Sequence, residues 1–178
     1  EDSFSKLVST FKSKVKIFQH NPVNLEQSSI PSEYFLSRGF KKSTLKFFKV
    51  GDCETKGLLY ERAIIPIYND DGSEIIGAIA RSTKEYRTPK FLIYPKGFDK
   101  RYCFYNYHNA IKTAEEKSCL YILEGQGDVW RMHEAGVKNA VGLFGKTISD
   151  QQEEKLKKLS VTHLIVILDN DQAGREAR

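Results

Sequence analysis

Two short stretches of the sequence end in carboxylates. The first, YILEGQGD, carries Glu124 and Asp128, and the second, LIVILDND, carries Asp169 and Asp171. Hard oxygen ligands of this kind suit Mg²⁺ or Mn²⁺, which accept one or two carboxylates each and keep their other positions for water or substrate phosphates. The residues therefore predict a divalent-metal site.

An alternative is that the two aspartates only begin a helix, because Asp is favoured at N-caps and in first turns. That alternative accounts for Asp169 and Asp171 but not for Glu124, which ends a second apolar run. We therefore favour the metal interpretation.

The elements that must position these acids are predicted from the apolar runs before them. Each run is short and rich in β-branched residues, which is typical of a strand buried on both faces of a parallel sheet. Strands are expected at 120–124, 139–143 and 163–168. They alternate with helices expected at 107–116, about 128–135 and 149–159, with another from about Gln172. Such alternation implies right-handed crossovers and a parallel sheet, so all four acids should meet at one edge.

The preceding part of the chain has a different pattern. Residues 1–20 have the spacing of an amphipathic helix with a lysine-rich face, and 21–32 read as a connector. Two short helices follow, one capped by Ser32 and closed by Gly39, the other from Ser43 to Phe48. AIIPIY and EIIGAIARS flank a turn, NDDGS, and predict a hairpin whose first strand lies at an edge or carries a bulge at Pro66.

These patterns together predict an α/β protein. An N-terminal helix and connector (1–31) are followed by a basic α+β subdomain (32–117) and a Rossmann-like parallel-sheet subdomain (118–178).

Charge is unevenly distributed along the 178 residues. Residues 1–118 carry 20 Lys/Arg against 14 Asp/Glu, whereas 119–178 carry 8 against 9, which together give the net charge of +5. The stretch 81–107 is the most basic and aromatic, as expected of a channel that holds phosphates and stacks bases. A basic part beside an acidic, metal-binding part suits a polyanionic substrate.

Composition excludes several other classes. Cys53, Cys103 and Cys119 are widely spaced and odd in number, which indicates neither a disulfide framework nor a zinc site. No apolar run is long enough to span a membrane, and a cytoplasmic setting is expected. The first residue is Glu1 rather than Met, so we expect a fragment.

Five blocks of the sequence, taken in order, resemble one known family. FLSRGFKKSTLKFFKVG, RAIIPIYNDDGSEIIGAIAR, TPKFLIYP, DKRYCFYN and the pair YILEGQGD with LIVILDND are similar to the catalytic core of DnaG-type DNA primases, with the glutamate-glycine and aspartate-x-aspartate motifs of a TOPRIM domain. The resemblance covers about residues 32–178. We favour a phage primase or primase-helicase.

The resemblance implies roles for individual residues. Glu124, Asp169 and Asp171 would be catalytic and hold Mg²⁺ or Mn²⁺, with Asp128 supporting them. The nucleotide and template path would be lined by Arg38, Arg62, Arg81, Lys90, Phe91 and Lys100. The implied reaction is template-directed synthesis of short RNA primers on single-stranded DNA from NTPs, a nucleotidyl transfer.

The same resemblance implies partners, and this sequence also departs from the family pattern at several positions. A replicative helicase, separate or fused, and an upstream zinc-binding module are expected, with the host cytoplasm as the location if the gene is phage-borne. Phe91 replaces the family's usual Tyr, Ile93 replaces an expected Asn, and the sequence stops soon after Asp171. We therefore expect this fragment alone to be inactive. Two alternatives remain: a TOPRIM-type metal-dependent nuclease, and an inactive TOPRIM module that only binds nucleic acid.

Overall fold

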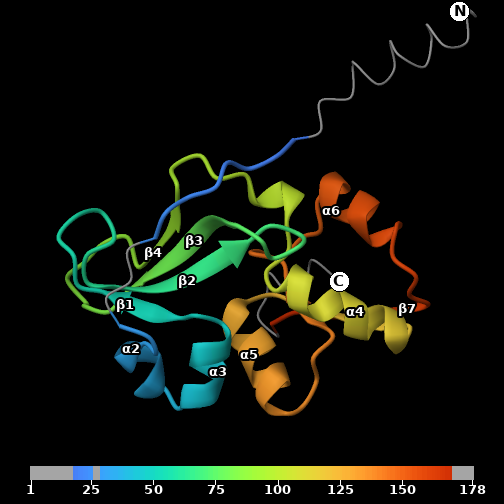
Figure 1. The fold of residues 1–178 in the computed structure, drawn as a ribbon, viewed down its shortest axis with the longest axis horizontal. Coiled ribbons are helices and arrows are strands. Elements are labelled where there is room, and N and C mark those ends of the chain that lie inside the picture. The colour runs from blue at the N-terminus through green and yellow to red at the C-terminus, as the bar shows by residue number, and fades with distance from the viewer. Residues whose placement is uncertain (1–17, 26–28, 170–178) are drawn as a thin grey trace, which may run out of the picture.

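Two β-sheets of different kinds organise the described part of the chain, and Figure 1 shows the antiparallel one with strands β1 to β4. The computed structural model describes residues 18–25 and 29–169. Within them, a four-stranded antiparallel sheet has the order β1-β2-β3-β4, and a three-stranded sheet has the order β6-β5-β7, with both neighbours parallel to β5. The expected α+β part followed by a parallel α/β part is confirmed.

The first part holds the antiparallel sheet and two short helices. Its elements are α2 (Glu33–Leu36), α3 (Lys42–Phe47), β1 (Gly51–Cys53), β2 (Arg62–Tyr68), β3 (Ile75–Ser82), β4 (Phe91–Tyr94) and the 3₁₀ helix η1 (Lys100–Tyr102). The Ser32 side chain accepts from the Phe35 amide as the predicted N-cap, and Gly39 takes a φ of 82° where α2 ends.

The second part alternates helices and strands as expected. Its elements are α4 (Tyr107–Glu116), β5 (Cys119–Leu123), α5 (Gln126–Glu134), β6 (Ala140–Gly142), α6 (Asp150–Leu156) and β7 (His163–Ile167). Ser149 caps α6 in a capping box with Gln152. The expected helix from Gln172 and most of the N-terminal helix lie outside the described residues.

The predicted hairpin forms, and its register decides where its side chains point. Arg62 pairs with Ser82 and Ala63 with Arg81, so the two arginines lie at the same end of the sheet on opposite faces. The β1 ladder on β2 ends at Ile64, so Pro66 lies on a stretch of β2 that only β3 pairs, and a register shift follows at Ile67/Tyr68. The expectation of an edge strand is therefore wrong, because β2 is an inner strand, and the irregularity in the ladder follows Pro66 at Ile67/Tyr68.

One hydrophobic cluster joins the two parts. Leu45 and Ile65 from the first part pack in the same cluster as Leu123 and Trp130 from the second. In Figure 1, α3 and α5 lie side by side beneath the antiparallel sheet, and the Phe48 and Trp130 rings are 6.3 Å apart. The proposed boundary at 117/118 remains a prediction.

The structure corrects one expectation about burial. β5 has the mixed, largely buried pattern of an inner strand, but every residue of β7 is exposed. β7 is a terminal strand of its sheet among the described residues and is paired only with β5, so its apolar composition does not correspond to burial on both faces. No helix in the described ranges is both long and apolar enough to cross a lipid bilayer.

Candidate active site and nucleic-acid interface

Glu124 and Asp169 meet at the carboxyl edge of the parallel sheet. Leu123 of β5 is level with Ile167 of β7, so the residues that follow the two strands leave the sheet together. The Asp169 backbone amide donates to Glu124 Oε2 at 3.2 Å. The prediction that these two acids share one edge is confirmed.

Asp128 lies beside them in the first turn of α5 and has a clear local role. Its Oδ2 accepts from the Gly125 amide at 3.2 Å, as the carboxylate of a capping box does. Its negative charge also lies at the helix N-terminus, where it is favourable. The structure therefore gives Asp128 the capping role, and its role toward a metal remains a prediction.

The donor set at this edge fits a divalent cation as far as the described residues reach. Glu124 and Asp169 are both hard oxygen donors, and Glu124 already faces a cation, because Lys146 Nζ lies 3.8 Å from Glu124 Oε1. Within the described ranges no three His, Cys, Asp or Glu side chains converge closely enough to hold a metal. Asp171 lies outside those ranges, so the predicted set of four is seen only in part.

Two lysines reach this edge, and only one of them was expected. Lys100 Nζ donates to the Phe144 carbonyl at 3.0 Å, in the loop that follows β6. Lys146 belongs to the same loop and pairs with Glu124. Lys146 was not predicted as a site residue. A signal that could have found it is its place in the loop after a strand parallel to β5, because parallel strands end at one edge.

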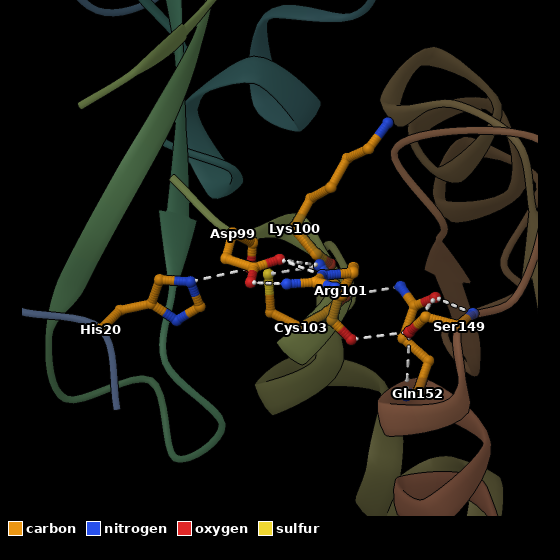
Figure 2. A network of polar contacts seen from close by, with 7 residues as sticks. All are labelled: His20, Asp99, Lys100, Arg101, Cys103, Ser149 and Gln152. Atoms are coloured by element: carbon orange, nitrogen blue, oxygen red, sulfur yellow. Dashed lines mark hydrogen bonds and ion pairs between the residues drawn. The ribbon is translucent and has the colours of Figure 1, made fainter. Parts of the chain in front are cut away.

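A polar network fixes the backbone from which Lys100 extends (Figure 2). Arg101 makes a paired contact with Asp99, at 2.9 and 2.7 Å, and the Asp99 carbonyl contacts His20 Nε2 at 2.9 Å. Ser149 Oγ donates to the Arg101 carbonyl at 2.8 Å, tying η1 to the start of α6. The Lys100 side chain points away from this network in Figure 2, which leaves its ammonium group to the Phe144 loop.

Three of the predicted binding residues line a basic pocket, and a fourth, Phe91, contacts one of them. The pocket has a volume of about 430 Å³, and Arg38, Arg81 and Lys90 line it together with Tyr34. The Arg38 and Arg81 guanidinium carbons lie 4.8 and 5.4 Å from the centre of the Tyr34 ring, and Arg81 also lies 4.9 Å from the Phe91 ring. Phe91 is 54% exposed, so its ring is available to a base.

The loop that carries Arg38 packs against the helix that follows Glu124. Arg131 of α5 donates to the Gly39 carbonyl at 2.9 Å and to the Arg38 carbonyl at 3.3 Å. Its guanidinium also lies 4.0 Å from the Phe40 ring. Because α5 begins at the acidic edge, these contacts fix the position of the loop that carries Arg38 relative to that edge.

Arg62 is placed differently from the prediction that it lines the path. It is only 3% exposed, and its Nη1 donates to the Pro89 carbonyl at 2.8 Å and to the Ala80 carbonyl at 3.3 Å. Burial and the nearby charge of Arg87 lower the pKa of Arg62. The structure gives Arg62 a supporting role beneath the loop 83–90, because its register puts it on the face opposite Arg81.

Comparisons with known proteins find a Toprim domain model and DNA primases. Residues 118–178 match the family model described as Toprim domain. DNA primase of Helicobacter pylori strain J99 is 28% identical over 177 residues, which covers 81% of this chain and 31% of that relative. The chain thus spans about a third of the length of the curated relatives it matches.

Solved structures agree with this at the level of the fold. The Aquifex aeolicus primase structure, with zinc-binding and RNA polymerase domains, is 25% identical with a TM-score of 0.71, covering 82% of this chain and 44% of that one. A DnaG primase catalytic domain bound to single-stranded DNA is 23% identical with a TM-score of 0.67, covering 82% and 55%.

Proposed function

We propose that this chain, whose residues 118–178 match the Toprim domain model and whose fold is similar to that of primase catalytic cores, is the polymerising core of a DNA primase. The observation that carries the proposal is the meeting of Glu124 and Asp169 at one sheet edge, within reach of Lys146. In this proposal the protein is a nucleotidyltransferase that makes short RNA primers on single-stranded DNA.

The acidic edge is the proposed reaction centre. Glu124, Asp169 and Asp171 would hold Mg²⁺ or Mn²⁺, with Asp128 keeping the first turn of α5 in place. Divalent ions bound there would supply activation of the primer 3′-hydroxyl and neutralisation of the triphosphate in an in-line displacement. The backbone amide of Asp169 orients Glu124 through Oε2, and Lys100 holds the loop that faces it.

The basic pocket is the proposed template site. Arg38, Arg81 and Lys90 would neutralise template phosphates, and Phe91 would stack on a base. A related primase domain binds single-stranded DNA, which supports the same substrate for this chain. Arg62 would contribute indirectly by holding the loop 83–90.

We extend the proposal to the setting of the full-length protein. One structural neighbour includes a zinc-binding domain, so we expect such a module upstream in the full-length protein. A replicative helicase partner, a cytoplasmic location and a phage origin are further parts of the proposal.

The test is primer synthesis by the full-length protein on single-stranded DNA with NTPs and Mg²⁺ or Mn²⁺. We expect Glu124→Gln and Asp169→Asn each to lower the rate about a hundredfold or more, the scale on which removing one preorganised electrostatic group from an active site acts. Glu116→Gln, which changes an exposed carboxylate at the end of α4, is the matched control and should leave the rate unchanged. Undiminished primer synthesis by both active-site variants would refute the site.

The same preparation distinguishes the alternatives. Cleavage of labelled DNA with Mn²⁺ and no NTPs, without primer synthesis, would establish the nuclease. DNA binding with neither activity and no Mn²⁺ binding would establish a module that only binds nucleic acid.

A further inference from the structure

The loop between β6 and α6 brings an ammonium group to the candidate reaction centre. Leu143 donates its amide to the Leu123 carbonyl at 2.9 Å, so the loop starts directly beside the end of β5. Lys146, three residues later, lies 3.8 Å from Glu124 Oε1. The two side chains are 31% and 18% exposed, so a ligand from solvent can reach both.

The backbone on both sides of Lys146 is held. Phe144 adopts a φ of 59°, and its carbonyl accepts from Lys100. At the other end Ser149 caps α6 and donates to the Arg101 carbonyl at 2.8 Å. Both ends of the segment that carries Lys146 are therefore held against neighbouring elements.

The contact between Lys146 and Glu124 is loose. A charge-assisted hydrogen bond from an ammonium group to a carboxylate spans about 2.7–2.9 Å, whereas this pair is separated by 3.8 Å. Ion pairs that are partly exposed to solvent contribute little to stability. A divalent cation and the ammonium group must also compete for the same Glu124 oxygen.

We propose that Lys146 is a charge-exchange residue: its ammonium group neutralises Glu124 when no divalent cation is bound and moves to the phosphates of a nucleoside triphosphate when one is. The inference rests on the proposed function and adds a residue and a ligand group to it. A lysine suits this task because its ammonium is a compact charge on a flexible stem of four carbons.

Two binding measurements on the full-length protein test the exchange, because they should move in opposite directions. In Lys146→Met, Mn²⁺ titrated without nucleotide, followed by electron paramagnetic resonance of the free ion, should bind about two- to fivefold more tightly, since a competing ion pair of modest strength is gone. ATP titrated with Mg²⁺ should bind about tenfold more weakly, since a charge-assisted phosphate contact is lost. Adenosine binding should not change.

Two further variants separate charge from structure. Lys146→Arg keeps the positive charge and should lie between the wild type and Lys146→Met in both titrations, because its charge is spread over a planar group. Lys112→Met removes the same charge from the exposed face of α4 and should match the wild type in both.

Failure of the Lys146 exchange and failure of the proposed function give different results. If the wild type binds Mn²⁺ and ATP but Lys146→Met changes neither, or weakens both, the exchange is wrong and the proposed function stands. If the wild type binds no Mn²⁺, the proposed metal site is wrong and the exchange fails with it.

Discussion

Trp130 is among the largest fully buried side chains of the described chain, and its indole has one polar group to satisfy. Trp130 Nε1 donates to the Tyr105 hydroxyl at 2.8 Å, inside the cluster that joins the two sheets. Burial also raises the pKa of Tyr105, so the hydroxyl stays neutral and available as an acceptor. This pair connects α5, which follows Glu124, to the chain just before α4.

Removing the hydroxyl should therefore destabilise the protein. In Tyr105→Phe the indole N–H remains buried without its acceptor, which costs about 1–3 kcal/mol. Urea unfolding measures the loss as a lower midpoint with an unchanged slope. Tyr86→Phe is the matched control: its hydroxyl donates to Glu61, but the ring is 73% exposed, so its change should stay within about 0.5 kcal/mol. Equal effects of the two variants would contradict the role of the buried bond.

Single residues differ in how far the sequence predicts them. Glu124 and Asp169 were predictable because a strand end is visible in the sequence and parallel strands end at one edge. Lys146 was missed because a lysine in a loop carries no periodic signal, and only the packing of that loop against β5 brings it to the acids. Arg62 was predicted as a contact residue, but the alternation of side chains along a strand put it on the face away from Arg81.

At the scale of elements, Arg62 acts on the loop 83–90 rather than on a ligand. Its guanidinium bonds to Pro89 and Ala80 carbonyls, below the pocket that Lys90 and Arg81 line. The loop also carries Arg87, which donates to the Gly57 carbonyl at 3.1 Å. A loop held from beneath in this way presents its charges in a fixed arrangement.

The salt dependence of DNA binding distinguishes a residue that contacts a phosphate from one that only supports the loop. Lys90→Ala, which removes a proposed phosphate contact, should weaken binding to single-stranded DNA and reduce the slope of log Kd against log salt by about 0.7. Arg62→Met should weaken binding by about tenfold with the slope unchanged, because the lost group supports the loop without neutralising a phosphate. Fluorescence anisotropy over a range of salt concentrations measures both. A reduced slope in Arg62→Met would instead make Arg62 a contact residue.

The order of the elements was predictable in large part, because their patterns are local. The hairpin around Asp71-Gly72, the cap at Ser149 and the span of α4 follow from turn, capping and helical signals in a few residues. The exposure of β7 was not predictable, since an apolar run does not reveal what packs against it. The role of Pro66 depended on how far β1 extends, which is a tertiary property.

At the scale of the whole molecule, contacts between the two sheets join the basic and acidic parts. Lys155 of α6 bonds to Asp70, in the turn of the β2–β3 hairpin, at 2.6 Å. The shared core and this ion pair place the hairpin against the parallel-sheet part, so we expect both parts to unfold in one transition. The free energy of unfolding of the whole molecule then depends on the groups that are buried in these contacts.

Three histidines are partly buried in the folded protein, and their burial makes its stability depend on pH. Burial lowers the pKa of His20, His108 and His133 below the ordinary value of 6.5. His108 packs against the Tyr68 ring at 4.9 Å, and His133 lies 4.5 Å from the Phe47 ring. In the folded protein these rings are therefore neutral at a pH where they would already be protonated in the unfolded chain.

The sign of the pH dependence follows from that difference. Between the ordinary pKa of 6.5 and the lowered values, the unfolded chain binds more protons than the folded protein. Stability therefore falls as the pH drops through that interval and is constant above it with respect to these groups. We expect the thermal midpoint to drop between pH 7.5 and 5, and His108→Gln to make this drop smaller. Lys112→Gln, one turn further along α4, is the control and should keep the full drop. A midpoint that rises on acidification would contradict the neutral, buried state of these rings.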